Sequence, residues 1–362
     1  MEGYQKILVI NLLHIGDLLL ATPALRTLRT NFPDAHITLL ADAKIDDLVK
    51  YNQNIDELIS VDKKGYHNKL GNFIRLIGEI RKQHYDLVIN FHPNERASAL
   101  AAFSGGKKIV GYASKGFGIF FNHLIHNTNF DFAYKNRPDI VHQAKEHLNT
   151  LQTTLGITKL DDRGLEMWLD ETTLQKAQKM WYEAFEANGI QPVRIPSKVI
   201  GFNTGASWPT KRWLPSGFAA VADALIEDGY GVAFLGGPMD IENVKQIRTM
   251  MKNAHHPAVI EFTGKIRLME LAALMKHCSV VLTNDSGPMH VAIANQVPVV
   301  TIFGSSNEVG FGPYNGNNIT LTKPEIDCRP CGEHLCQKGL HECMSAITPN
   351  QVIQAVQNIL RQ

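Results

Sequence analysis

A polar turn at residues 284–290 carries side chains that could bind a phosphate. It reads Asn-Asp-Ser-Gly-Pro-Met-His and follows Val280 to Leu282, a short apolar run typical of a buried parallel strand. Pro288 suits the first turn of a helix, and Asp285 or Ser286 suits its N-cap. The free N–H groups and positive dipole end of this helix would attract phosphate.

His290 lies one helical turn beyond Ser286, so both side chains share one face of the expected helix. The alternative is that Asp285 and Ser286 only cap the helix and that His290 is packed in the core. Taken alone, these residues favour neither interpretation.

Asp17 could act as a general base. It follows Gly16 just after the apolar run 6–12, where a strand gives way to a helix. Gly16 permits a sharp turn and a close approach of substrate. The helix dipole favours an ionised carboxylate, which can accept a proton at neutral pH. The alternative, which the residue by itself favours, is an aspartate that only caps the helix.

Lys211 and Arg212 lie in a loop after the apolar run 198–203, within Gly-Ala-Ser-Trp-Pro-Thr-Lys-Arg-Trp at 205–213. A lysine there can neutralise phosphate as a point charge. The alternative is a solvated loop charge, which is the usual fate of a single lysine.

Apolar runs alternate with helical patterns in both halves of the chain, which predicts two α/β domains with doubly wound parallel sheets. A polar helix and proline-rich breaks between about 161 and 196 indicate a linker. Two such domains would face each other across a cleft, the usual place for a ligand. The expected strands lie near 6–12, 37–41, 57–61, 86–90, 108–112, 198–203, 231–235, 258–262, 280–282 and 297–303.

Composition and absent motifs narrow the function. The 362 residues carry a net charge of +1, which gives no case for nucleic-acid binding. We find no secretory signal and no apolar run long enough to span a membrane, so we expect a cytoplasmic protein. There is no G-x-G-x-x-G after the first strand, no P-loop and no G-x-S-x-G, so we expect no cofactor.

Three motifs together carry a family resemblance: 205–213, 284–290, and His-Ile-Gly-Asp-Leu-Leu-Leu-Ala-Thr-Pro-Ala-Leu at 14–25. In this order they resemble those of the lipopolysaccharide heptosyltransferases, glycosyltransferase family 9. The resemblance implies a GT-B fold with two facing Rossmann-like domains. It also implies inverting, metal-independent transfer of heptose from ADP-L-glycero-D-manno-heptose to the inner core of lipopolysaccharide, at the inner face of the inner membrane.

The resemblance assigns roles to residues of both halves. Asp17 matches the family's proposed base, and Lys211 matches its phosphate-binding lysine, which we also count as catalytic. The nucleotide-sugar motif covers Asp285, Ser286, Gly287 and His290, and a nucleotide-contacting loop covers Ala206 and Ser207. No metal is assigned to the site.

We expect residues 1–185 to form the acceptor-binding domain and residues 196–348 the nucleotide-sugar domain. The last helix, 349–362, is expected to pack back on the first domain. Acceptor contacts are expected from His14, Asn90, His92 and Arg96. Arg96 is the strongest of them, because guanidinium suits carboxylate and phosphate. Surface charge is the favoured role of Lys107, Lys108 and Lys115, although they could attract an acidic acceptor.

Four of the five cysteines follow the pattern Cys328-x2-Cys331-x4-Cys336-x6-Cys343. In a cytoplasmic protein this spacing suggests zinc more than disulfides, but the later intervals are irregular and unliganded thiols are the favoured interpretation. Cys278 is expected in the core.

Three other functions remain open: a GT-B glycosyltransferase with another nucleotide sugar, a non-catalytic nucleotide-sugar-binding protein and, more weakly, a sugar epimerase of similar shape. The resemblance extends to second and third heptosyltransferases in different parts of the chain, so the acceptor sugar is open too.

Overall fold

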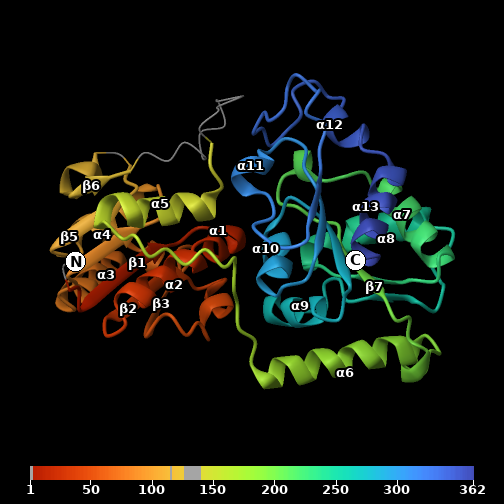
Figure 1. The fold of residues 1–362 in the computed structure, drawn as a ribbon, viewed down its shortest axis with the longest axis horizontal. Coiled ribbons are helices and arrows are strands. Elements are labelled where there is room, and N and C mark those ends of the chain that lie inside the picture. The colour runs from red at the N-terminus through yellow and green to blue at the C-terminus, as the bar shows by residue number, and fades with distance from the viewer. Residues whose placement is uncertain (1–2, 115, 126–139) are drawn as a thin grey trace. The chain divides into compact units, whose positions relative to one another are not determined.

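The computed structural model describes residues 3–114, 116–125 and 140–362 (Figure 1). Its contacts divide the chain into two compact units, with the boundary between Trp168 and Leu169. Each unit is built on a doubly wound parallel sheet, as the sequence predicts.

Within the described residues, the first unit contains a six-stranded parallel sheet in the order β3-β2-β1-β4-β5-β6. The chain places β2 on one side of β1 and β4 on the other, so the order reverses between β1 and β4. Open α/β sheets bind ligands at such a reversal, outside the carboxyl ends of the strands. The strands are β1 (Lys6–Asn11), β2 (His36–Asp42), β3 (Glu57–Val61), β4 (Leu87–Asn90), β5 (Lys108–Gly111) and β6 (His123–Leu124).

Helices cover the first sheet and follow its strands in the chain: α1 (Ile15–Leu20), α2 (Thr22–Asn31), α3 (Leu70–Lys82), α4 (Glu95–Phe103) and α5 (Gln143–Leu155). Short 3-10 turns lie at Asp46–Val49, Tyr66–Asn68 and Phe117–Phe120. Arg26 of α2 is 7% exposed and contacts the last segment of the first unit. Its NH1 forms an ion pair with Glu166 Oε2 at 2.8 Å, and its NH2 donates a hydrogen bond to Gly164 O at 3.0 Å. This buried arginine fixes the return segment against the domain core.

The second unit repeats the plan. Its described residues form a six-stranded parallel sheet in the order β12-β11-β10-β7-β8-β9, which reverses between β7 and β10. The loop after β7 and the turn after β10 therefore meet at one sheet edge. The strands are β7 (Val199–Asn203), β8 (Gly231–Phe234), β9 (Val259–Glu261), β10 (Val280–Asn284), β11 (Val299–Ile302) and β12 (Ile319–Leu321).

The helices of the second unit are α6 (Glu171–Ala187), α7 (Pro215–Glu227), α8 (Ile241–Met250), α9 (Leu268–Met275), α10 (Gly287–Ala294), α11 (Glu308–Phe311), α12 (Glu342–Ser345) and α13 (Pro349–Leu360). 3-10 turns lie at Pro192–Arg194, Pro209–Lys211 and Pro238–Asp240. No helix of the described residues is both long and apolar enough to cross a membrane.

The domain boundary differs from the expected one, because α6 belongs to the second unit rather than to residues 1–185. Ala177, Trp181 and Phe185 form its buried stripe at intervals of four residues. The Trp181 ring stacks on His277 and Phe262, with centroids 5.2 and 6.1 Å apart. These partners lie far along the chain, so local sequence could not assign the helix.

The C-terminal helix packs within the second unit. α13 contributes Val352, Ala355, Val356, Ile359 and Leu360 to the core of that unit. It lies against α7 and strands β10 to β12. Its apolar stripe completes the cover of this sheet.

Candidate functional site

The turn after β10 forms as the sequence predicts. Ser286 is the N-cap of α10 in extended conformation, with Pro288 in the first turn. The Ser286 hydroxyl lies 3.4 Å from Asn203 Oδ1 and 3.3 Å from the Thr283 hydroxyl. His290 is buried on the first turn of α10. Ser286 and Gly287 thus lie at the carboxyl edge of the sheet, where the N–H groups at the start of α10 are directed.

Lys211 and Asp285, predicted from separate motifs, form a close ion pair. Lys211 Nζ lies 2.6 Å from Asp285 Oδ2, and both side chains are largely buried, at 18% and 7% exposed. The same carboxylate oxygen accepts a hydrogen bond of 2.5 Å from the Ser306 hydroxyl. The ammonium also lies 4.4 Å from the centre of the Trp208 ring, where a cation–π contact stabilises it. This arrangement holds a cation at the start of a helix.

Hydrogen bonds position residues 204–213, which we call the lysine loop, at the sheet edge. Asn284 Nδ2 donates to Thr204 O at 2.8 Å, and Asn284 Oδ1 accepts from Trp213 N at 3.0 Å. Arg212 Nε donates to Ala206 O at 2.8 Å. The two ends of the loop are therefore tied to one residue of β10. Within it Ala206 is buried and Ser207 is exposed.

Gly205 permits a close approach inside this loop, since an added Cβ would lie 1.8 Å from Asp240 Oδ1. Asp240 accepts a bond from Gly237 N at 2.8 Å. Burial raises the pKa of Asp240, and the Gly237 bond and the charge of Arg212 oppose the rise. Sequence reasoning did not find this carboxylate.

In the first unit, Asp17 lies on the first turn of α1, just beyond the end of β1, and is partly exposed. Its Oδ2 accepts a bond of 3.2 Å from the backbone N–H of His14, the N-cap. Asn11 Nδ2 donates to Asp17 O at 2.9 Å. The carboxylate therefore has the capping role that we weighed and is also held at the sheet edge that can accept substrate.

Asn90 and His92 lie at the end of β4, next to the end of β1. Asn90 is fully buried, and its Nδ2 donates to Tyr112 O at 2.5 Å and His92 O at 3.1 Å while its Oδ1 accepts from His92 N at 3.2 Å. The amide of Asn90 therefore positions His92. The expected contact of Asn90 with the acceptor stays a prediction.

His92 is 5% exposed, and its Nδ1 has no hydrogen-bond partner in the described part of the chain. Burial lowers its pKa to about 3, with smaller contributions from the charges of Lys63 and His14. The ring is thus neutral and lies near Lys63 and His14 at the carboxyl edge.

Arg96 is engaged by the segment after β3. Its NH1 donates to Lys63 O at 2.8 Å and its NH2 to Asn68 Oδ1 at 2.8 Å, and the guanidinium lies 5.5 Å from the Phe73 ring centre. These contacts use two of the five N–H donors of the guanidinium and hold the segment that carries Lys63. The expected contact of Arg96 with the acceptor stays a prediction.

Lys63 is a further candidate at this sheet edge, and sequence reasoning did not single it out. Its Nζ lies 2.8 Å from Asp42 Oδ2 and also donates to Leu12 O, at the end of β1. It follows β3 by two residues, so its place at a strand end was the available signal. By contrast, Lys107 and Lys108 lie at the amino end of β5, and Lys107 pairs with Asp86 at 2.7 Å. Lys115 lies outside the described residues.

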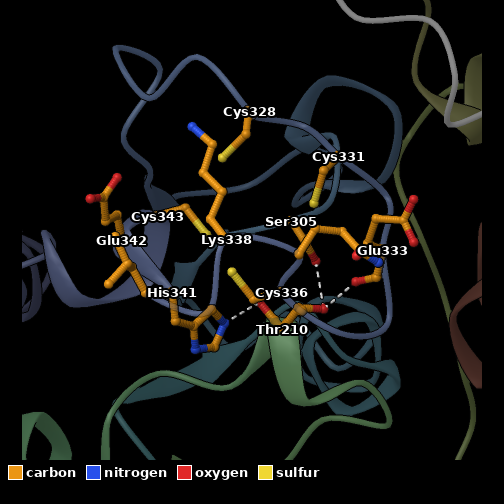
Figure 2. A pocket seen from close by; sticks show the side chains of 12 residues that line it. Thr210, Ser305, Cys328, Cys331, Glu333, Cys336, Lys338, His341, Glu342 and Cys343 are labelled. Atoms are coloured by element: carbon orange, nitrogen blue, oxygen red, sulfur yellow. Dashed lines mark hydrogen bonds between the residues drawn. The ribbon is translucent and has the colours of Figure 1, made fainter.

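The four clustered cysteines line one pocket of the second unit, with free thiols (Figure 2). Backbone N–H groups, that of His341 foremost, lower the pKa of Cys336. Burial raises the pKa of Cys343 to about 11, and the other three cysteines add to the rise. As the described side chains stand, no group of three or more His, Cys, Asp or Glu is arranged to hold a metal ion. Cys278 is buried, as expected.

Two doubly wound parallel sheets, each with polar groups at its reversal point, are the architecture of the GT-B fold of glycosyltransferases. The chain superposes on a glycosyltransferase family 9 structure from Veillonella parvula DSM 2008, with a TM-score of 0.84, 36% identity and coverage of 99% and 97% of the two chains. For Escherichia coli ADP-heptose lps heptosyltransferase II, the TM-score is 0.75 with 21% identity and 99% coverage of both.

The chain belongs to glycosyltransferase family 9, the heptosyltransferases, whose family model matches residues 73–341. Lipopolysaccharide heptosyltransferase 3 of Escherichia coli K12 is 27% identical over 354 residues, 95% of each chain. Lipooligosaccharide heptosyltransferase 2 of Campylobacter jejuni (strain NCTC 11168) is 26% identical over 350 residues, 96% of each. The predicted family and enzyme class are thereby confirmed.

The low pKa of His92 makes a testable contribution to stability. In the unfolded chain His92 has an ordinary pKa near 6.5 and takes up a proton below that pH. In the folded chain its pKa is about 3, so between these two pH values only the unfolded chain binds this proton. The contribution of His92 to the free energy of unfolding is therefore complete above about pH 6.5 and is lost as the pH falls toward 3. The unfolding free energy of the wild type relative to His92→Gln should therefore fall by about 1.4 kcal/mol per pH unit between about pH 6 and 4.

Urea unfolding of both proteins, followed on the transition of the first unit, measures this difference. His123→Gln, at an exposed position of the same sheet, is the control and should show no such slope. A pH-independent difference between wild type and His92→Gln would contradict the assignment of a neutral buried His92.

Proposed function

We propose that this protein transfers heptose from ADP-L-glycero-D-manno-heptose to a sugar of the lipopolysaccharide inner core, with inversion and without a metal ion. The observation that carries the proposal is the buried Lys211–Asp285 pair at the start of α10, within a chain of heptosyltransferase family. The curated relatives are named as lipopolysaccharide and lipooligosaccharide heptosyltransferases, which supports the acceptor class.

The second unit, in this proposal, binds the donor. The diphosphate lies against Ser286, Gly287 and the N–H groups at the start of α10, beside the ammonium of Lys211. As the glycosidic bond breaks, negative charge grows on the departing ADP. A fixed cation and fixed N–H groups stabilise that charge more than they stabilise the bound donor, which lowers the barrier.

Two further donor roles follow from position. Ala206 and Ser207, in the loop tied to Asn284, are assigned to the nucleotide. His290, one turn along α10, is assigned to the wall of the same subsite. Asp285 is assigned to holding Lys211, since its carboxylate contacts the ammonium directly.

The first unit supplies the base and the acceptor site. Asp17 removes the proton from the acceptor hydroxyl as its oxygen attacks the anomeric carbon from the face opposite ADP. This single displacement inverts the configuration. The N–H of His14 orients the carboxylate, while Lys63 offers the acidic acceptor a cation beside neutral His92.

Base and leaving-group site belong to different units, so transfer requires both units to engage one donor and one acceptor together. Exclusion of water at that stage would protect the donor from hydrolysis. The alternatives are transfer from another nucleotide sugar and donor binding without turnover.

Donor selectivity tests the proposal first. Calorimetric titration should show binding of ADP-heptose and at least tenfold weaker binding of UDP-glucose and GDP-mannose. Lys211→Met should weaken ADP-heptose binding about tenfold or more, because a charge-assisted contact to phosphate is lost. Arg248→Met, which removes a charge pairing with Glu261, is the control and should leave binding unchanged. Preference for a UDP- or GDP-sugar would overturn the named donor.

Asp17→Asn separates binding from chemistry. The variant keeps the size of the side chain but cannot accept the proton, so transfer should fall by at least about a hundredfold. The dissociation constant for ADP-heptose should change less than twofold. Measurement of both constants with one protein preparation suffices. Unchanged turnover would remove Asp17 from the role of base.

A membrane-facing surface would fit a lipid-linked acceptor. Tyr66, Leu70 and Ile74 are spaced by four residues and are 52%, 73% and 58% exposed. Lys69 and Arg75 are exposed beside them. Asn68, which Arg96 bonds, joins this surface to the segment of Lys63. Apolar side chains flanked by cations favour binding to an anionic bilayer, so we propose contact with the inner face of the inner membrane.

Vesicle sedimentation tests this surface. Leu70→Glu with Ile74→Glu should reduce binding to phosphatidylglycerol vesicles at least fivefold, because buried apolar area is lost and negative charge is added. Val193→Glu with Met239→Glu alters two comparably exposed residues of the second unit and should have little effect. Equal losses in both variants would exclude a specific surface.

A further inference from the structure

A pocket formed by residues 328–343 lies directly behind the lysine loop. Its walls include Thr210, Ser305 and all four clustered cysteines. Figure 2 shows the sulfur atoms of Cys328, Cys331, Cys336 and Cys343 turned inward from different sides of this space. The proposed transfer reaction does not use these thiols, so the clustering of four cysteines in one pocket has to have another role.

The first pair lies in a turn that suits a chelate. Cys328-Arg-Pro-Cys331 is followed by Gly332, whose φ of +67° is strained for residues with a side chain. Gly332 N donates to Ser305 O at 2.8 Å, and Arg329 Nε donates to Gly304 O at 2.6 Å. The turn is thus fixed to the end of β11. Two cysteines two residues apart are the usual half-site of structural zinc.

The second pair lies in a complementary turn. Gly339, with φ +69°, lets the chain fold back on itself, and its N–H donates to Cys336 O at 3.1 Å. From this turn Cys336 lines the same pocket as the first pair. Cys343 reaches the same space from the start of α12.

We propose that these four cysteines bind one thiophilic transition metal ion, zinc or iron, as a tetrathiolate site. Four thiolates around one ion are typical of zinc and iron sites. Binding of the divalent ion releases the protons of the four thiols to solvent and forms four metal–sulfur bonds, with no change of oxidation state.

The thiols line the pocket without yet forming a coordination geometry. Coordination therefore requires some of the cysteines to change rotamer within it, which moves sulfur atoms while the backbone turns stay in place. The competing occupants of the pocket are disulfides and unliganded thiols, and the tests below separate all three.

The metal would act on donor binding through the residue next to Lys211. Thr210 Oγ1 donates to Glu333 O at 2.6 Å and accepts from the Ser305 hydroxyl at 3.0 Å, and His341 Nε2 lies 3.0 Å from Thr210 O. The His334 ring stacks on Trp208 with centroids 3.9 Å apart. A bound ion would therefore make the residues that support the lysine loop more rigid. The expected effect on donor binding rests on the proposed function, in which Lys211 binds the donor phosphate.

Metal content of the full-length protein, purified without chelator, is the primary test. Elemental analysis should find about one equivalent of zinc or iron, and the four thiols should resist a thiol reagent until a strong chelator is added. Cobalt(II) should give the absorption bands of tetrahedral thiolate coordination. Cys331→Ser and Cys336→Ser should each lower the metal content at least fivefold, whereas Cys278→Ala, outside the pocket, should retain it.

Two outcomes overturn the site regardless of activity. One is less than a tenth of an equivalent of either metal, both as purified and after reconstitution with zinc and gel filtration. The other is thiols that are oxidised to disulfides, or that react freely in the protein as purified. Because these readouts involve no sugar nucleotide, they are independent of the identity of the donor.

The link to the donor is tested on one preparation before and after chelation. Removal of the metal should raise KM for ADP-heptose several-fold with a smaller change in kcat, and added zinc should reverse the shift. Unchanged kinetics with complete metal loss would overturn the link. If the metal is present but no nucleotide sugar is turned over, the proposed function fails and the metal site stands.

Discussion

The contact between Lys211 and Asp285 is the interaction on which the second unit's site depends. Removing two opposite charges from water costs several kcal/mol per ion, and only close geometry with further hydrogen bonds recovers it. Here the geometry is supplied by the 2.6 Å ion pair, the Ser306 hydroxyl and the Trp208 ring. The loop from Thr204 to Trp213 is held where the pair needs it, by Asn284.

The first unit follows the same principle with different residues. Strand ends bring Asp17, His92 and Lys63 to one edge. The backbone N–H of His14 holds Asp17, Leu12 O and Asp42 hold Lys63, and the Asn90 amide holds the backbone of His92. Asn90 and Arg96 donate hydrogen bonds to the loops that carry these groups. Both units therefore present a few charged atoms on frameworks that are already hydrogen-bonded, which limits the reorganisation needed when substrates bind.

Sequence predicted the parts of this structure that depend on local pattern. The alternating apolar runs identified both sheets, and the turns at Gly16 and Gly287 placed Asp17 and Ser286 at strand ends. The contacts of Lys63 with Asp42 and of Arg96 with Asn68 were missed, because they join residues whose proximity only the folded sheet determines. The unit to which α6 belongs was missed for the same reason: an amphipathic stripe shows that a helix is buried but not which residues cover it.

The position of α6 affects how the protein can be divided. Trp181 covers the rings of Phe262 and His277, so a fragment that begins at Leu169 keeps this apolar surface shielded. A fragment that begins after Ala187 would leave it bare, and exposed patches of this kind promote aggregation. Efforts to obtain the second unit alone, for crystallisation or ligand screening, should therefore retain the helix that sequence pattern had placed in the other domain.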